Sequence, residues 1–412
     1  KIIIGARSAI FTPLKNIGLI IVDEEQESSY KQTAPDPKYH AREVALMRGK
    51  ISNATVILSS ATPSIESYYN YKKNKYKYLN LPERIGNAKL PTIHLVDMIE
   101  ENKKTEKFGS IFSEFMVQKI KDRINKNEQI ILLHNRRGFA PILHCSECGE
   151  IALCSHCKLS MTYHKIDNSL KCHFCNYSLK VFSRCKACQS FNVQLSGTGT
   201  QKVENELEKI FPDICIDRLD LDSTPTASKI FKTLEKFSNN EINILIGTQM
   251  IAKGLDFANT TLVGIINSDT GLFLPDFRSG ERVFQLIYQA AGRAGRGNIP
   301  GEVVVQTYNS NNQVIKLASK LDLVNYYDEC LKERSELNYP PYSWLVRLEI
   351  RARNKRDVET SIKKLNNKIP SLPIGIEKLG PAYCYREKLK DQYRMQIVIK
   401  SNKKYDPSGS KL

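Results

Sequence analysis

Eight closely spaced cysteines constrain the fold of this chain more than any other feature of its sequence. They fall into four Cys-x-x-Cys pairs: Cys145/Cys148, Cys154/Cys157, Cys172/Cys175 and Cys185/Cys188. A two-residue gap lets both thiolates of a pair face one metal ion, and four thiolates complete a tetrahedral zinc site. The sequence therefore predicts two zinc ions, although spacing alone leaves open which pairs share an ion.

The predicted zinc sites are structural. Four thiolates saturate each ion and leave no open position for a water molecule, so catalytic chemistry is expected elsewhere in the chain. So short a segment has little hydrophobic core of its own, and loss of zinc should unfold it. We expect the segment to be a metal-stabilised docking module.

The chain is strongly basic. It contains 61 lysines and arginines against 44 aspartates and glutamates, a formal net charge of +17 at pH 7. This excess favours a polyanionic partner, with DNA or RNA as the first candidate, although a merely well-solvated surface is the alternative. No apolar stretch approaches the roughly 20 residues of a membrane span, and no signal peptide opens the chain, so we expect a cytoplasmic protein without a membrane partner.

Short apolar runs recur along the chain and end in small, polar or acidic residues. They lie at 17–22, 55–58, 130–133, 242–246, 262–266 and 303–305. Such runs are typical of strands buried on both faces of a parallel sheet, and the helical stretches between them predict an α/β fold with two separate sheets. Ligands bind at the carboxyl ends of such strands.

Two acids follow the first of these runs. Asp23 can hold Mg²⁺ through water, and Glu24 can orient and deprotonate an attacking water. These are the two roles that nucleotide hydrolysis requires. An acid pair after an apolar run is also common on protein surfaces, so the pair alone does not identify a site.

A glutamine and two arginines are spaced to share one helix face. Gln289 and Arg293 are four residues apart, and Arg296 follows after three more. Two clustered guanidinium groups suit the γ-phosphate of a nucleotide, where they stabilise the charge of phosphoryl transfer. The alternative is an arginine pair that docks on carboxylates.

Two further segments follow predicted strands. The segment at 247–257 reads G-T-Q-M-I-A-K-G-L-D-F and contains Gly247, Thr248 and Asp256. Its small and polar residues can offer N–H groups and hydroxyls to a phosphate. Ser60 and Thr62 belong to a Ser-Ala-Thr sequence, for which an ordinary hydroxyl-stabilised turn is the alternative.

The loop after the acid pair mixes aromatic and basic residues. The candidates for nucleic-acid contact are Tyr30, Lys31, Tyr39 and Arg42. Such a loop can stack on single-stranded bases while its cations follow the phosphate backbone. A polar surface loop with incidental tyrosines is the alternative.

In chain order, four of these segments resemble the motifs of superfamily 2 helicases. They are D-E-x-x at 23–26, S-A-T at 60–62, the segment 247–257 and Q-x-x-G-R-x-G-R at 289–296. Together with G-A-R-S-A-I-F-T-P at 5–13, N-R-R-G-F-A-P at 135–141 and the eight-cysteine insert, the sequence is similar to the primosomal replication protein N′ (PriA) family of replication-restart helicases. The resemblance covers essentially the whole chain.

This resemblance implies an α/β fold with two RecA-like helicase lobes, the first incomplete, an inserted two-zinc module and a small α+β C-terminal domain. The implied ranges are 1–100 for the first lobe, 101–143 for a linker and the start of the second, 144–190 for the zinc insert, 191–310 for the rest of the second lobe and 311–412 for the C-terminal domain. The phosphate-binding sequence G-x-x-x-x-G-K-S/T is absent from the 412 residues. We therefore expect an N-terminally truncated chain that is nearly inactive alone.

The resemblance also implies roles for the candidate residues. Asp23 and Glu24 would act on Mg²⁺-bound ATP from the first lobe, and Arg293 and Arg296 would reach that ATP from the second. Ser60 and Thr62 would couple nucleotide state to DNA binding, and Gln289, Gly247, Thr248 and Asp256 would complete the nucleotide site. Arg136 and Arg137 would join the loop residues in DNA contact and coupling.

The zinc ligands of this family are nested. Carried over, one ion would be held by Cys145, Cys148, Cys185 and Cys188, and the other by Cys154, Cys157, Cys172 and Cys175. Two positions depart from the family pattern, because Gln26 and Leu255 stand where histidine is usual or common. We expect these departures to alter coupling at most.

The implied function is an ATP-dependent 3′→5′ DNA helicase that recognises stalled or abandoned replication forks and initiates primosome assembly for replication restart. Implied partners are forked and single-stranded DNA, the single-stranded DNA-binding protein, and primosome and helicase-loading proteins, in the bacterial cytoplasm at the nucleoid. The alternative is a non-enzymatic, zinc-containing DNA-binding scaffold. Retention of both the acid pair and the arginine pair favours the enzyme.

Overall fold

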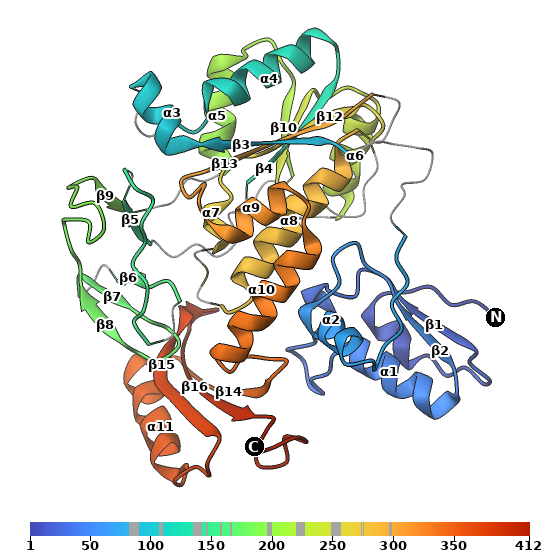
Figure 1. Ribbon diagram of the computed structural model, residues 1–412, viewed down its shortest axis with the longest axis vertical. Coiled ribbons are helices and arrows are strands. Elements are labelled where there is room, and N and C mark those ends of the chain that lie inside the picture. Colours follow the sequence, from blue (N-terminus) through green and yellow to red (C-terminus); the bar gives the residue numbers. More distant parts are fainter. Residues whose placement is uncertain are drawn as a thin grey trace. The chain divides into compact units, whose positions relative to one another are not determined.

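The computed structural model describes the chain except for residues 82–89, 107–109, 135–141, 146, 157–158, 165–166, 196–199, 220–226, 249–256, 273, 275 and 296–298. The chain divides into two compact units, Lys1–Asn80 and Leu81–Leu412 (Figure 1). Each unit has its own parallel sheet, as the α/β interpretation predicted.

The first unit is built on two parallel strands. Strand β1 (Leu19–Val22) pairs with β2 (Thr55–Leu58), and helix α1 (Ala41–Ser52) connects them. Helix α2 (Ile65–Lys72) follows β2, and the short 3-10 turns η1 (Arg7–Phe11) and η2 (Ser28–Tyr30) complete the unit. Because the strands are parallel and in register, their carboxyl ends lie next to each other.

The strands of this first sheet are not buried on both faces, contrary to the prediction. Leu19, Ile21 and Ile57 are 52%, 60% and 43% exposed, whereas Val22 is buried. Two strands and the helices that the structure describes in this unit leave one face of the sheet without a covering layer. The apolar pattern was that of a buried strand, and burial depends on neighbours that the pattern does not specify.

The second unit contains a six-stranded parallel sheet in the order β10-β11-β4-β12-β13-β3. Its strands are β3 (Thr92–Asp97), β4 (Gln129–Leu133), β10 (Ile216–Leu219), β11 (Ile244–Gly247), β12 (Thr260–Ile265) and β13 (Glu302–Thr307). Every described residue of β4, β11 and β12 is buried. The prediction of doubly buried strands is therefore confirmed for these three strands.

Helices cover both faces of the six-stranded sheet (Figure 1). One layer contains α3, α4 and α5, and the other contains α7, α8 and α9. The helices are α3 (Met98–Thr105), α4 (Glu114–Asn125), α5 (Thr200–Ile210), α6 (Ala227–Ser238), α7 (Asp269–Leu272), α8 (Ser279–Arg293), α9 (Gln313–Ser319) and α10 (Leu323–Glu336).

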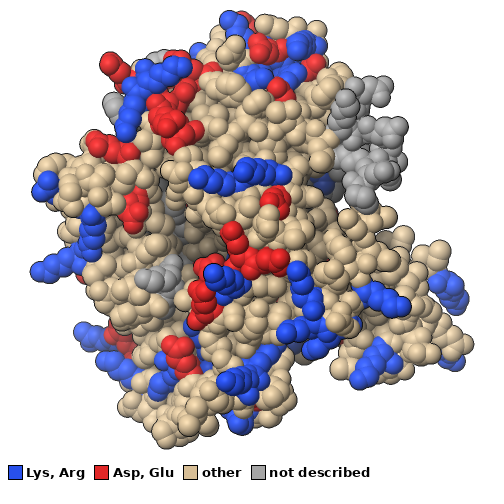
Figure 2. Space-filling model, viewed as in Figure 1, with Lys and Arg blue, Asp and Glu red and all other residues tan. Residues whose placement is uncertain are grey.

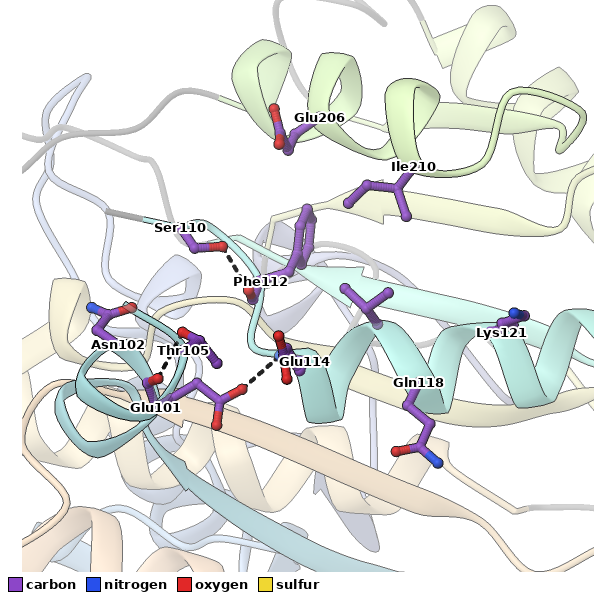
Figure 3. Close-up of a pocket in the computed structure, with 11 residues that line it drawn as sticks. Glu101, Asn102, Thr105, Ser110, Phe112, Glu114, Gln118, Lys121, Glu206 and Ile210 are labelled. Carbon is purple, nitrogen blue, oxygen red and sulfur yellow. Dashed lines mark hydrogen bonds between the residues drawn. The ribbon is translucent and has the colours of Figure 1, made fainter. Parts of the chain in front are cut away.

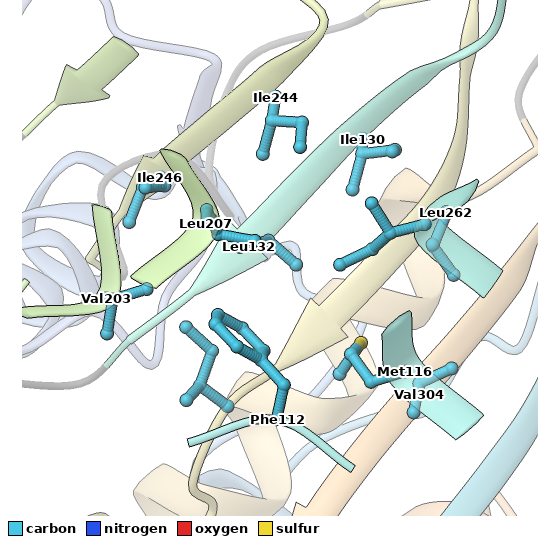
Figure 4. Packing of buried hydrophobic residues seen from close by; sticks show 12 residues of the cluster. Phe112, Met116, Ile130, Leu132, Val203, Leu207, Ile244, Ile246, Leu262 and Val304 are labelled. Carbon is cyan, nitrogen blue, oxygen red and sulfur yellow. The ribbon is translucent and has the colours of Figure 1, made fainter. Parts of the chain in front are cut away.

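The core between the sheet and helices α4 and α5 follows from the helix period, in which residues i and i+4 share a face, and the strand period, in which residues i and i+2 do. Met116 and Ile120 lie one turn apart on α4, and with Leu207 of α5 they pack on Ile130 and Leu132 of β4 (Figure 4). All five side chains are fully buried. Each contributes roughly 1.5–3 kcal/mol relative to an exposed side chain.

The zinc module and the C-terminal domain belong to the second unit. In the module, β5 (Leu143–Cys145) pairs with β9 (Val193–Leu195), and β6 (Thr162–His164), β7 (Ser169–Lys171) and β8 (Ser178–Lys180) form a second small sheet. The C-terminal domain is an antiparallel sheet of β14 (Ser343–Ala352), β16 (Gln392–Asn402) and β15 (Ile376–Leu389), with α11 (Lys355–Lys368) packed on one face. Among the helices that the structure describes, none is long and apolar enough to span a membrane.

The first unit ends well before residue 100, the predicted end of the first lobe. The first unit ends at Asn80, and β3 is the edge strand of the second unit's sheet, where Thr92–Asp97 pairs with β13. Helix α3 follows β3 directly, with Asp97 as its N-cap. The polar residues around β3 are typical of a linker, but β3 pairs with β13, which lies some two hundred residues later in the sequence.

An ion network at the start of β13 predicts how the second unit responds to acid. Lys119 Nζ lies 2.8 Å from Glu302 Oε1, and Arg123 and His94 also donate to this carboxylate. Burial alone would raise the pKa of Glu302, but the hydrogen bonds from Lys119, His94 and Arg123 lower it to about 2. A lowered pKa adds stability above the ordinary value of 4.5, and this stability is lost as the pH falls towards 2.

We expect the free energy of unfolding of the chain to fall between pH 4.5 and 2 more steeply than that of the Glu302→Gln variant. Glutamine does not take up a proton in this range, so the variant lacks this contribution to the slope. Urea unfolding of both proteins across the range measures the difference. Two parallel pH profiles would contradict the role assigned to the network.

Candidate nucleotide site and zinc module

The predicted catalytic acids lie at the carboxyl end of β1. Asp23 Oδ1 accepts hydrogen bonds from the backbone N–H of Glu24 at 3.0 Å and from Ser59 Oγ at 3.1 Å. Glu24 has a φ of 47°, in the left-handed region that non-glycine residues seldom adopt. Such strain concentrates at functional sites, where it aims a side chain.

A side-chain relay connects Glu24 to the Ser-Ala-Thr segment after β2. Gln26 Nε2 donates to Glu24 Oε2 at 2.5 Å, and Ser60 Oγ donates to Gln26 Oε1 at 2.6 Å. Ser60 Oγ in turn accepts from the N–H of Thr62, whose side chain is fully buried. The amide of Gln26 both accepts and donates, so this residue joins the two segments by hydrogen bonds.

Arg7, more than twenty residues earlier in the sequence, holds the loop that follows the acid pair. Arg7 donates to the carbonyl of Ser29 and to Gln32 Oε1, both at 2.9 Å, and its guanidinium lies 5.7 Å from the ring centre of Tyr39. The Tyr30 hydroxyl donates to the Asp23 carbonyl at 2.7 Å. Burial, together with the charges of Asp23 and Glu27, raises the pKa of Tyr30.

Among the four predicted DNA-contact residues of this loop, Lys31 is exposed and Tyr30 and Tyr39 are partly buried. Sequence reasoning did not assign Arg7 or Gln32 a role in the loop. Their partners lie some twenty residues away or are backbone carbonyls, which no local spacing reveals.

Arg42, a predicted DNA contact, lies in a buried ion pair. Its side chain is 10% exposed, and its Nη1 donates to Glu25 Oε2 at 2.8 Å and to Ser64 Oγ at 2.5 Å. Burial alone would lower the pKa of Arg42, but the Glu25 and Glu43 carboxylates raise it above its ordinary value. Arg42 thus neutralises the buried third acid of the 23–26 segment and fastens α1 to the start of α2.

Arg42→Met is expected to destabilise the first unit by about 3–5 kcal/mol, because it leaves the Glu25 charge buried without its partner. The double variant Glu25→Gln, Arg42→Met removes both charges and should restore most of that loss. Amide hydrogen exchange over α1 measures the effect. Lys31→Ala, at an exposed residue of the same loop, should change stability by less than about 0.5 kcal/mol. Equal losses in the single and double variants would contradict the pairing.

In the second unit, the candidate phosphate-binding residues stand at the carboxyl edge of the six-stranded sheet. Gly247 ends β11, and its carbonyl accepts from the N–H of His134, which follows β4. Thr248 is 5% exposed, and its hydroxyl has no hydrogen-bond partner among the described residues. A buried hydroxyl without a partner is costly and is consistent with a missing ligand. Asp256 lies outside the described residues.

Helix α8 carries two more candidates. Gln289 and Arg293 lie one turn apart near its end, and both are partly buried. A methyl group placed on the intervening Gly292 would meet no atom within 4 Å, so the helix surface is open there. Arg296, Arg136 and Arg137 lie outside the described residues. Asp23 and Glu24 belong to the first unit, whereas Gln289 and Arg293 belong to the second, and the two units are described separately.

Sequence reasoning missed a buried acid at this sheet edge. Asp269 is fully buried and accepts from the Thr307 hydroxyl and the Tyr308 N–H, both at 2.7 Å. Burial raises the pKa of Asp269 to about 6. Its position just after the strand at 262–266 was the available signal. The contacts join the start of α7, just after β12, to the end of β13.

The outer cysteines form a complete ligand set. The thiols of Cys145, Cys148, Cys185 and Cys188 all lie within 4.8 Å of one another. The Cys145–Cys188 and Cys148–Cys185 sulfur distances are 3.6 and 3.5 Å. Four sulfurs at about 2.3 Å from a tetrahedral zinc lie about 3.8 Å apart, so the arrangement fits this metal. This is the set that the family resemblance implied.

The inner cysteines form a second group. Cys154, Cys172 and Cys175 lie within the same reach of one another, and Cys157 lies outside the described residues. The residue after a pair adopts positive φ in three cases: Gly149 at 74°, Asn176 at 70° and Gln189 at 62°. At Gly149 a side chain would meet the Tyr308 carbonyl at 2.2 Å, so glycine lets this turn lie directly against the helicase-type sheet.

A hollow of about 630 Å³ lies between α3, α4 and α5 (Figure 3). Its lining includes the apolar side chains of Phe112, Val117 and Ile210 and the four charged ones of Glu101, Glu114, Glu206 and Lys121. Three carboxylates against one ammonium group repel phosphate. This hollow is therefore not the nucleotide site.

Positive charge gathers on the C-terminal domain. In Figure 2, Lys and Arg side chains cluster at the lower edge of the view, where Figure 1 places α11 and its sheet. The exposed basic residues of this domain include Arg353, Lys355, Arg356, Lys363, Lys364, Arg386, Lys388 and Lys390. Arg394 differs, because it donates twice to Glu349 at 2.8 and 2.9 Å and is largely buried.

Three known domains match successive parts of the second unit. The Cys-rich region domain of PriA DNA helicase matches residues 154–180, the helicase conserved C-terminal domain matches 181–298, and the C-terminal domain of primosomal protein N matches 335–410. The matches cover part of the zinc module, strands β10, β11 and β12 of the parallel sheet and the C-terminal sheet.

Curated relatives match nearly the whole chain. The replication restart protein PriA of Bacillus subtilis is 41% identical over 97% of this chain, that of Chlamydia pneumoniae 40% over 97%, and that of Rickettsia felis 37% over 98%. The chain covers 49%, 54% and 62% of these proteins, so it spans about half the length of the relatives it matches. With these three domain matches and 37–41% identity over 97–98% of its length, the chain belongs to the PriA family of replication restart proteins.

Proposed function

We propose that the whole protein is an ATP-dependent 3′→5′ DNA helicase that recognises stalled or abandoned forks and initiates primosome assembly. The direction and the restart role rest on the family and on the names of the relatives. The relatives are about twice as long as this chain, which supports a first lobe completed by further residues. The exposed apolar side chains of Leu19, Ile21 and Ile57 support it too, because added strands would bury them.

The hydrogen-bonded relay from Glu24 through Gln26 to Ser60 carries this proposal. It joins the residue that would activate water to the segment that would report DNA binding. Asp23, held by Ser59, would bind Mg²⁺ through water, and Mg²⁺ would neutralise charge on the β- and γ-phosphates. An acid pair that served only as a surface feature would not need a strained Glu24 or such a relay.

The second unit would supply the remaining groups for ATP. Arg293 and Arg296 would stabilise charge on the transferred phosphoryl group, with Gln289 beside them. The buried hydroxyl of Thr248 fits a role next to the ligand, because it has no partner within the described part of the chain. Gly247 and Asp256 would belong to the same edge.

We propose that the cysteines hold two zinc ions in the nested arrangement. The outer set supports this directly by its sulfur spacing, and three of the four inner ligands lie together. Ser60, Thr62, Arg136 and Arg137 would couple hydrolysis to DNA, and Lys31, Tyr30 and Tyr39 would contact the strand from the loop that Arg7 holds.

The proposed partners follow from the family. They are forked and single-stranded DNA, the single-stranded DNA-binding protein and the primosome and helicase-loading proteins, in the cytoplasm at the nucleoid. The basic surface of the C-terminal domain supports the DNA part of this proposal.

Unwinding of a model fork by the whole protein tests the function. Strand separation should require ATP and Mg²⁺, and turnover of ATP should rise with single-stranded or forked DNA. The direction is read from substrates with a single-stranded tail at one end only. Tight fork binding without ATP turnover would instead support the zinc-containing scaffold, which the match to the helicase conserved C-terminal domain does not favour.

A further inference from the structure

Arg334 near the end of α10 clamps the start of α8. Its side chain is 2% exposed, and its Nη2 donates to Glu281 Oε2 at 2.7 Å. Its Nη1 donates to the carbonyl of Pro340 at 3.0 Å, and its guanidinium lies 5.1 Å from the ring centre of Phe277. One buried cation thus holds the first turn of α8 and the turn that leads into the C-terminal sheet.

Tyr339 extends this clamp to two other parts of the unit. Its ring stacks on Phe277 with centroids 4.7 Å apart and planes 5° from parallel. Lys400 of β16 lies 4.3 Å from the Tyr339 ring centre, and Phe174 of the zinc module meets the same ring edge-on at 6.3 Å. The helicase-type domain, the C-terminal sheet and the zinc module therefore meet at one side chain.

The zinc module and the C-terminal sheet are also joined beside this contact. His173 Nδ1 lies 2.9 Å from the Tyr383 carbonyl, and Gln396 Nε2 donates to the His173 carbonyl at 2.7 Å. Backbone groups of both parts take part, so the segment after β7 and the sheet are expected to shift together. A displacement of either part reaches Tyr339.

Helix α8 leads from this contact to the proposed nucleotide site. Glu281 lies in its first turn and Arg293 at its end, twelve residues and roughly 18 Å further on. Just after the helix, Gly295 has a φ of 67° and its backbone touches that of Gly301. A side chain at Gly295 would lie 2.2 Å from the backbone nitrogen of Gly301. Contacts hold the chain at Gly295, just after α8, and at Phe277, just before it. A small shift of the first turn of α8 is therefore expected to change the position of the Arg293 side chain.

We propose that Tyr339, Phe277 and Arg334 form a joint that sets the position of α8 according to the zinc module and the C-terminal sheet. These are positioning residues, because they act on the proposed ATP site through Arg293. The inference rests on the proposed function, and it adds a route by which DNA or a partner bound at those two parts would regulate ATP hydrolysis.

Tyr339→Leu in the whole protein tests the joint, with Tyr326→Leu as the matched control. Both tyrosines are 3% exposed, and Tyr326 stacks on Phe284 of α8 at 4.0 Å. Each substitution removes one aromatic stack on or just before α8. Of the two tyrosines, it is Tyr339 whose ring contacts a ring of the zinc module, that of Phe174, within the described part of the chain. We expect Tyr339→Leu to keep DNA-free ATP turnover and to lower the DNA-stimulated turnover by roughly 3- to 30-fold.

Phe174→Leu on the zinc module should give the same loss, and adding it to Tyr339→Leu should cause no further loss, because both act through one contact. Tyr326→Leu should leave the stimulation ratio unchanged. Equal losses for Tyr339→Leu and Tyr326→Leu, or no loss for either, would overturn the joint.

Amide hydrogen exchange of α8 separates the joint from the proposed function. Phe174→Leu should raise exchange in the first turns of α8, although Phe174 lies in another part of the chain. If the whole protein hydrolyses no ATP, the proposed function fails while this readout still decides the joint. Unchanged exchange in α8 would overturn it.

Discussion

Replacing Cys172 by serine is expected to release one zinc ion and unfold the small sheet of β6, β7 and β8, while the outer ion stays bound. Cys172 is 1% exposed and belongs to the compact core of the module, which also contains Leu159, Met161 and Leu170. Binding of a structural zinc ion contributes roughly 10–16 kcal/mol of apparent free energy to the folding of such a segment, far more than a hydrophobic core of this size supplies. Native mass spectrometry should count one zinc per chain instead of two.

The nested arrangement makes a sharper prediction for pairs of variants. Cys148→Ser and Cys185→Ser should release the same ion, so their combination still retains one zinc. Cys148→Ser with Cys172→Ser should release both. Cys215→Ser is the matched control, because this exposed thiol lies apart from both groups and its loss should leave two ions. Loss of both ions from the Cys148→Ser, Cys185→Ser pair would contradict the assignment.

Glu24→Gln in the whole protein is expected to reduce DNA-stimulated ATP turnover by about 10²–10⁴-fold, because glutamine cannot accept the proton of the attacking water. Glutamine retains the shape of the side chain and can still bond to Gln26. Fork binding measured by fluorescence anisotropy should therefore remain near that of the unaltered protein.

Asp36→Asn is the control for Glu24→Gln, since this exposed acid lies in the same unit and away from the relay. It should retain full turnover. If the Glu24→Gln variant still unwinds forks, Glu24 does not activate the attacking water. Fork binding lost together with turnover would show that the substitution damages the fold.

The cysteine module was predictable because its information is local. Two-residue spacings define ligand pairs without knowledge of the fold, and the sulfurs of Cys145 and Cys188 meet as a zinc site requires. The parallel sheet of the second unit was predictable for the same reason, since runs such as that of β4 are buried on both faces.

The structure departs from the sequence-based expectations where contacts join residues that are distant in sequence. Arg42 had the composition of a DNA contact, but Glu25, 17 residues earlier, makes it a buried ion-pair partner. Strand β3 had polar neighbours on both sides and pairs with β13, so the boundary at 100 fell within the second unit. Arg334 and Glu281 stand 53 residues apart in two different helices, and no local spacing marks their contact.

We propose that Glu24 and Arg293 act in one phosphoryl-transfer step, although they belong to different units. The most direct measurement is ATP turnover of the whole protein with Glu24→Gln, Arg293→Lys and both together. Residues that act as a unit are far from additive, so each single variant should lose about 10²–10⁴-fold and the double variant should lose little more. If the two losses multiply, or if Arg293→Lys retains full turnover, the two residues do not share an ATP.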